Sequence, residues 1–163
     1  MGRLLVTDDR ALRATVLGFR ELDADYRREL NKTTRTVLGP EFTRAVAKHA
    51  RTTLDTRVLV TGAKVQGGNP PVLVAGSSRR KMRGGMVPDT DWPVVEFGTL
   101  DRNKVTAYTR RGAQVRRHTR RQLPARVKSG RVVMPAVADV VPKLTSMWVQ
   151  QFVRLVYEAA GED

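Results

Sequence analysis

The first strong pattern along the chain is an amphipathic one that begins at Gly18. Apolar residues then recur every three or four positions, with charged residues between them: Phe19, Leu22, Tyr26 and Leu30. This spacing predicts a helix with one buried face. Gly39-Pro40 interrupts it, and proline suits the first turn of a new helix. Residues 18–50 are therefore predicted to form two helices or one kinked helix, and Ala14 to Leu17 either extend it or add an edge strand.

The period shortens after residue 56, where short β-branched runs replace the helical pattern. Arg57–Thr61 and Pro71–Ala75 flank the turn-forming run Gly67–Pro70, so they are predicted to be neighbouring strands. The same character predicts further strands at Trp92–Phe97, ended by Gly98, and at Arg131–Met134, closed by a proline.

Residues 105–121 carry the pattern of a long hairpin. Val105–Thr109 would lead outward and Val115–Thr119 would return, with Arg111-Gly112 near the tip. Neither strand has enough apolar residues to bury even one face. We therefore expect a projecting arm that occupies about 99–128.

The pattern becomes helical again from about Val137 to Ala160. Pro142 would suit the first turn of this helix. The broad apolar stripe consists of Leu144, Met147, Trp148, Gln151, Phe152, Leu155, Val156 and Ala159. Trp148 and Phe152 are expected in the core.

The order of these elements predicts one α+β domain over 1–163. An N-terminal kinked helix or helix pair and a long C-terminal helix would pack on a small, mostly antiparallel sheet, from which the basic hairpin arm projects. A chain of this length can bury a single hydrophobic core.

Charge is concentrated in the middle third. The net charge is +14, and residues 79–131 hold 15 basic and 4 acidic residues, with no acidic residue at all between 107 and 131. We therefore expect a polyanion nearby. Three arginine pairs stand out as residues that contact a partner or DNA: Arg110 and Arg111, Arg116 and Arg117, Arg120 and Arg121.

These arginines have three possible roles: a solvated surface, contact with phosphates, or ion pairing with an acidic protein. Tyr108 is the only aromatic residue of the arm that could stack on a base. Any contact with nucleic acid should therefore be electrostatic and independent of sequence.

Catalytic and metal-binding patterns are missing from the sequence. It contains no cysteine, its histidines His49 and His118 are isolated, and it has no phosphate-binding glycine loop or nucleophile elbow. Asp89 and Asp91 lack a third ligand and are explained by a turn. We expect no enzyme, no metal and no cofactor.

No apolar run approaches the roughly 20 residues that span a bilayer, and the N-terminal apolar stretch is short for a signal peptide. We therefore expect no membrane partner and synthesis in a bacterial cytoplasm.

The segment Val94-Val95-Glu96-Phe97-Gly98-Thr99 resembles the "vEFGT" signature of the small siphophage tail-completion family, whose members are also called head-to-tail connector, neck or minor tail-component proteins. The order of other features agrees: a leading amphipathic helix, a variable excursion after the signature, then Met134-Pro135-Ala136 before a long helix. The chain departs from the family where Gly130–Ala136 replaces the commoner "PFLRPA" segment. The resemblance covers roughly 18–160.

The resemblance implies a structural virion protein at the head-tail junction. Such a protein forms a ring, expected to be a hexamer, that joins the head-closure ring to the tail terminator or tube around the path of the genomic DNA. Glu96, Phe97 and Gly98 would then be the family motif and a possible subunit interface. The alternative hypothesis is a nonspecific nucleic-acid-binding protein that uses residues 79–131.

Overall fold

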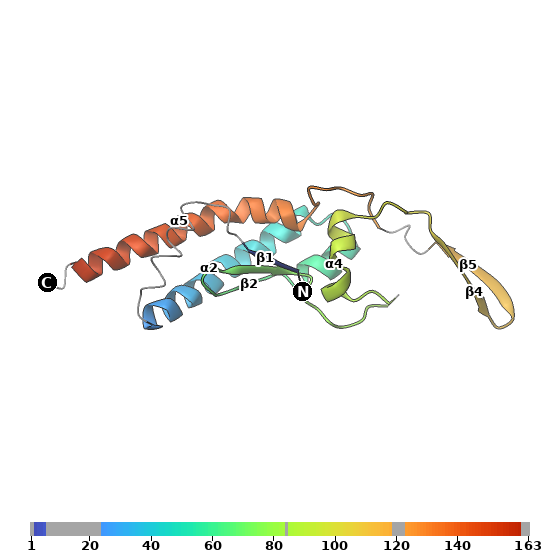
Figure 1. Ribbon diagram of the computed structural model, residues 1–163, viewed down its shortest axis with the longest axis horizontal. Helices are drawn as coiled ribbons and strands as arrows, with labels where there is room; N and C mark the ends of the chain where they lie inside the picture. Colours follow the sequence, from blue (N-terminus) through green and yellow to red (C-terminus); the bar gives the residue numbers. More distant parts are fainter. Residues whose placement is uncertain (1, 6–23, 84, 119–122, 161–163) are drawn as a thin grey trace.

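The computed structural model describes residues 2–5, 24–83, 85–118 and 123–160. In chain order the elements are β1 Gly2–Leu5, α2 Ala24–His49, α3 Thr53–Asp55, the π-helical turn η1 Thr56–Val60, β2 Lys64–Gln66, β3 Val72–Ala75, α4 Pro88–Phe97, β4 Val105–Arg110, β5 Ala113–His118 and α5 Val133–Ala160. Figure 1 shows an elongated molecule, with the β4–β5 hairpin near one end and the C-terminal half of α5 at the other.

The first long helix is α2, a single element that continues through Pro40. Of the two predicted alternatives, the structure has one helix rather than two, although a proline inside a helix removes one backbone hydrogen bond. Burial explains why the helix continues, because a stripe at every fourth position faces the core on both sides of the proline: Leu30, Thr34, Leu38, Phe42 and Val46. Residues 18–23 and the possible strand at 14–17 lie outside the described residues.

A three-stranded antiparallel sheet has the order β1-β3-β2. Strand β3 confirms the prediction at Pro71–Ala75, and its neighbours are Gly2–Leu5 and Lys64–Gln66. The predicted strand at Arg57–Thr61 is wrong. The Thr52 side chain accepts a hydrogen bond from Asp55 N, and Asp55 accepts one from Thr52 N, so a capping box starts helical structure here.

The segment predicted as a strand at Trp92–Phe97 is instead the helix α4. Pro88 occupies its first turn, where the missing N–H costs nothing, and the Asp91 carboxylate accepts a hydrogen bond from Val87 N at 2.7 Å. These two start signals outweigh the β-branched character of the residues that follow.

The strand predicted at Arg131–Met134 is also wrong, because α5 begins at Val133. Pro135 lies in the first turn of this helix rather than closing a strand. Pro142, expected in the first turn, lies well inside the helix.

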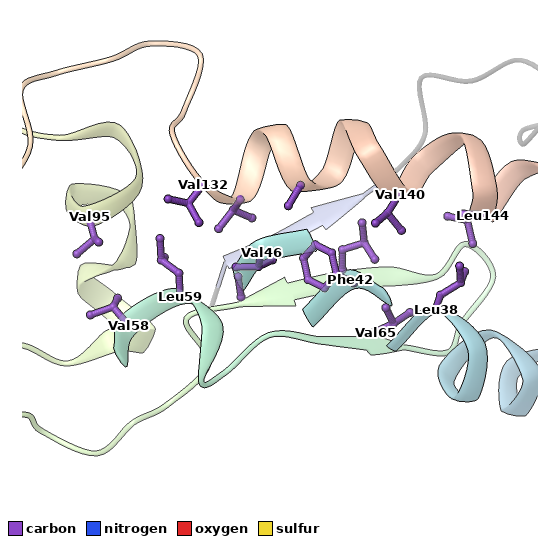
Figure 2. Packing of buried hydrophobic residues seen from close by; sticks show 14 of the residues in the cluster. Leu38, Phe42, Val46, Val58, Leu59, Val65, Val95, Val132, Val140 and Leu144 are labelled. Carbon is purple, nitrogen blue, oxygen red and sulfur yellow. The ribbon is translucent and has the colours of Figure 1, made fainter. Parts of the chain in front are cut away.

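The core lies between α2, α5 and the three-stranded sheet (Figure 2). Phe42 and Val46 of α2 are fully buried, as are Leu144 and Trp148 of α5. Trp148 is therefore confirmed as a core residue, whereas Phe152 is only partly buried against the core. Helices and small antiparallel sheets together confirm the predicted α+β class.

In the part of the chain that the structure describes, none of the helices has the length and apolar character needed to span a bilayer.

Candidate functional site: the β4–β5 hairpin and its anchored root

Strands β4 and β5 form the predicted hairpin, although β5 begins at Ala113 rather than at Val115. The antiparallel register runs from Val105 opposite His118 to Arg110 opposite Ala113. The connecting residues Arg111 and Gly112 both have positive φ, at 52° and 79°. Positive φ at both central positions is typical of the tight turns that suit twisted hairpins. The turn therefore places an arginine at the tip.

The predicted arginines whose side chains the structure describes do not all lie on one face of the hairpin. Arg110, Arg111 and Arg116 are exposed, but Arg110 lies opposite Ala113 and Arg116 opposite Ala107, which places them on opposite faces of the hairpin. Arg117 lies in β5, where its backbone pairs with Thr106 of β4. Arg120 and Arg121 lie outside the described residues.

One face of the hairpin carries an apolar pair. Tyr108 and Val115 lie directly opposite each other, so their side chains share a face. Tyr108 is 39% exposed and Val115 is half-buried. The hairpin thus combines a small apolar face with cationic side chains.

Backbone contacts join the two ends of the excursion. Thr99 N donates to Pro124 O at 3.0 Å, Val127 N donates to Phe97 O at 2.8 Å, and Thr99 and Ala125 form an isolated β-bridge. Gly98, at φ 75°, would bring any Cβ into collision with the Ala125 carbonyl. We call these contacts the root clasp, which fixes the point from which the hairpin leaves the body.

Glu96 holds the first turn of α5. Its fully buried carboxylate accepts hydrogen bonds from the backbone N–H groups of the residues that open the helix, at 2.9 to 3.1 Å: Arg131, Val132, Val133 and Met134. A carboxylate at this end satisfies unpaired N–H groups and favours the helix dipole. Glu96 therefore joins the end of α4 to the start of α5.

Arg131 extends this junction to α3. Its guanidinium donates to Val95 O at 3.2 Å and pairs with Asp55 at 3.4 Å, where the Asp55 side chain is 1% exposed. Gly130, at φ 77°, leaves room for the Glu96 carboxylate beside it. The contacts of Asp55, Gly130 and Arg131 around Glu96 could not be predicted from the sequence, because only the fold brings together positions so far apart.

The Glu96-Phe97-Gly98 segment thus has a structural role that differs in part from the expectation. It ends a helix rather than a strand, while Gly98 permits the sharp turn as predicted. Phe97 is half-buried, and its ring centroid lies 6.2 Å from that of Trp92.

A pocket of about 720 Å³ lies beside the root clasp. Its lining is mainly apolar and includes Met86, Pro93, Val94, Phe97, Leu100 and Leu123, with Asp91, Asp101 and Arg126 also present. Leu100 is 79% exposed and Val94 is 37% exposed. We call this surface the root pocket.

The remaining residues considered for chemistry have structural partners. His49 Nε2 lies 2.9 Å from the Asp139 carboxylate, so this histidine joins α2 to α5, and Asp89 pairs with Arg79 at 3.4 Å. Among the described residues no group of three or more His, Cys, Asp or Glu could hold a metal ion.

No protein-family model matches the chain, and neither the curated proteins nor the solved structures yield a match.

Proposed function

We propose that the chain is a structural protein of a phage virion that forms a ring, a hexamer by the family resemblance, at the head-tail junction. There it joins the head-closure ring to the tail terminator or tube. The observation that carries the proposal is the β4–β5 hairpin: an exposed, cationic two-stranded element that leaves the body at a fixed point. The resemblance around Glu96-Phe97-Gly98 supplies the class of assembly.

The physical role of such a hairpin is adhesion. A two-stranded hairpin on its own is marginally stable in water, so it gains from packing against a partner. Arginine side chains of like charge oppose disordered aggregation, and they form charge-assisted hydrogen bonds with acidic groups of a neighbouring subunit or ring. This combination suits a protein that assembles into a closed ring and then joins a preformed one.

The test is the composition and architecture of virions from the source that encodes the chain. We expect the chain in purified particles, and density for a ring of it at the neck in a cryo-electron-microscopy map. Virions without the chain would overturn the proposal. Hairpins that reach an adjacent ring would identify protein partners, whereas hairpins that line the channel would identify contact with DNA.

A nonspecific nucleic-acid-binding protein remains the second candidate, favoured by the exposed side chains of Arg110, Arg111 and Arg116. It predicts affinity for DNA that falls steeply with log salt concentration. It also predicts a smaller salt slope when Arg116, Arg117, Arg120 and Arg121 are all changed to alanine. Unchanged binding by that variant would exclude the second candidate.

A further inference from the structure

We infer that the root pocket receives the β4–β5 hairpin of a second copy of this chain, so that neighbouring subunits join head to tail. This inference rests on the proposed function, which calls for a ring but does not identify the surfaces that form it. Three features support the contact: the apolar surface of the pocket, the apolar face of the hairpin and the charges that surround both.

The root pocket exposes apolar surface that the other described residues leave uncovered. Leu100 is the most exposed of the large hydrophobic residues in the described part of the chain, at 79%, and it lines the pocket together with the half-buried Phe97. The volume of about 720 Å³ is large enough for more than one side chain. Exposed apolar surface next to a hollow is typical of an interaction site.

The hairpin presents a matching apolar face that packs on none of the other described helices or strands with more than marginal contact. Tyr108 and Val115 form a cross-strand pair, and the two strands pack mainly on each other rather than on a helix or the other sheet. Figure 1 shows the hairpin extending away from α4, whose residues line the pocket, so the hairpin does not fill the pocket of its own chain.

Charge favours the same pairing. Residues 105–118 include four arginines and no acidic residue, whereas two carboxylates, Asp91 and Asp101, and one cation, Arg126, line the pocket and leave it with a net negative charge. Asp101 is exposed and lies next to Leu100, so it could meet an arginine from the incoming hairpin once Tyr108 is inserted. A second copy of the chain thus supplies both the apolar side chains and the charge that the pocket requires.

The geometry permits an assembly that closes on itself. Six-residue strands span about 20 Å, which is enough for the hairpin to reach across a subunit boundary. Pocket and hairpin are different surfaces of one chain, so the contact is heterologous and generates a ring when the rotation closes. The root clasp fixes the point on the body from which the segment that carries each hairpin leaves.

Cysteine cross-linking tests the contact directly, because the chain contains no cysteine of its own. Full-length Leu100→Cys, carrying a tag, is mixed with untagged Tyr108→Cys and treated with a short bismaleimide reagent. We expect a cross-linked heterodimer. The matched control is Thr109→Cys, which is exposed on the opposite face of the same hairpin and should cross-link several-fold less.

A second measurement follows assembly by sedimentation velocity. Leu100→Asp should shift the purified chain from oligomer to monomer. Val153→Asp, an equally drastic change at a 45% exposed residue of α5, should leave the oligomer intact. Circular dichroism checks that both variants remain folded.

Three results would each overturn the inference. They are cross-linking no greater than in the Thr109→Cys control, a chain that is monomeric at every concentration tested, and loss of the oligomer in Val153→Asp alone. The proposed function fails by a different result. Virions could contain the chain although the cross-link does not form, and the purified chain could form the cross-link although virions contain none of it.

Discussion

The indole Nε1 of Trp148 donates a hydrogen bond to the Thr34 hydroxyl at 3.0 Å, and neither side chain is exposed to solvent. This contact ties α5 to α2 in the middle of the core. It also explains why a polar residue occupies the buried stripe of α2, since an indole N–H that is removed from water requires an acceptor.

Replacing Thr34 with valine tests this contact. The change keeps the shape of the side chain but removes the acceptor, so we expect the free energy of unfolding to fall by about 1–3 kcal/mol. Urea denaturation followed by tryptophan fluorescence measures the change. Thr36→Val, at an exposed position of the same helix, is the control and should change stability far less. Equal effects of the two substitutions would contradict a specific role for the buried bond.

Glu96 is the second position at which a single substitution should have a large effect. Glu96→Ala leaves several N–H groups at the start of α5 without their acceptor inside the core, and each such group costs about 1–3 kcal/mol. Glu96→Gln keeps one acceptor oxygen but loses the favourable charge at the helix terminus, so it should cost less, about 1–2 kcal/mol.

The control for both is Glu41→Gln, which breaks an exposed ion pair with Lys143 and should cost no more than about 1 kcal/mol. Chemical denaturation monitored by circular dichroism ranks the native chain and the three variants by their free energies of unfolding. An alanine variant as stable as the native chain would show that Glu96 does not hold the helix terminus.

Gly98→Ala should open the root clasp. An alanine at this position would have to adopt a φ of 75°, which residues with a Cβ rarely do, and its methyl group would collide with the Ala125 carbonyl. We expect hydrogen-deuterium exchange to accelerate at the amides of Thr99 and Val127, which the clasp protects. Gly39→Ala is the matched control, because Gly39 lies in α2 with nothing within 4 Å of an added Cβ. In the Gly39→Ala variant, hydrogen-deuterium exchange at Thr99 and Val127 should match that of the native chain.

Acid should weaken the contact between α2 and α5 at Asp139. The hydrogen bond with His49, followed by the positive charge of Lys48, lowers the pKa of Asp139 from its ordinary value of 3.8. A carboxyl group with a lowered folded-state pKa stabilises the fold above 3.8, and this contribution is lost as pH falls through the lowered value.

The prediction is checked by the melting temperatures of the native chain and Asp139→Asn, recorded from neutral pH to below 3.8. We expect the difference between the two proteins to persist above pH 3.8 and to shrink below it as Asp139 becomes protonated. A difference that stays constant with pH would mean that the carboxylate charge contributes nothing.

Sequence patterns predicted those parts of the fold that depend on local periodicity. The long helices α2 and α5, the strand at Val72–Ala75 and the turn of the β4–β5 hairpin at Arg111-Gly112 all follow from spacing and turn residues. Tyr26 is an exception, because it was predicted on the buried face of the first helix and is 43% exposed. The errors at Arg57–Thr61 and Trp92–Phe97 have a common cause: β-branched residues suggested strands, whereas capping groups upstream had already started helices.

The candidate site was only partly predictable for a different reason. The exposed arginines and the turn at Gly98 are visible in the sequence, but the role of Glu96 depends on a helix that begins 37 residues later. The root pocket likewise combines Met86, Leu100 and Leu123, which only the tertiary structure brings together. A signal was present in Glu96 itself, because a carboxylate between apolar residues requires donors when it is buried.

Because of the root clasp, the length of the hairpin should have little effect on the free energy of unfolding of the body. Because Thr99 and Ala125 are held side by side, the intervening segment behaves as a closed loop, and doubling the length of a flexible loop costs only about 0.6 kcal/mol. The hairpin at residues 105–118, none of which belongs to the core cluster, could therefore be lengthened, shortened or exchanged for another with little effect on folding. If the hairpin makes the proposed contacts, their specificity can change by replacement of this one segment, while the scaffold that holds it stays the same.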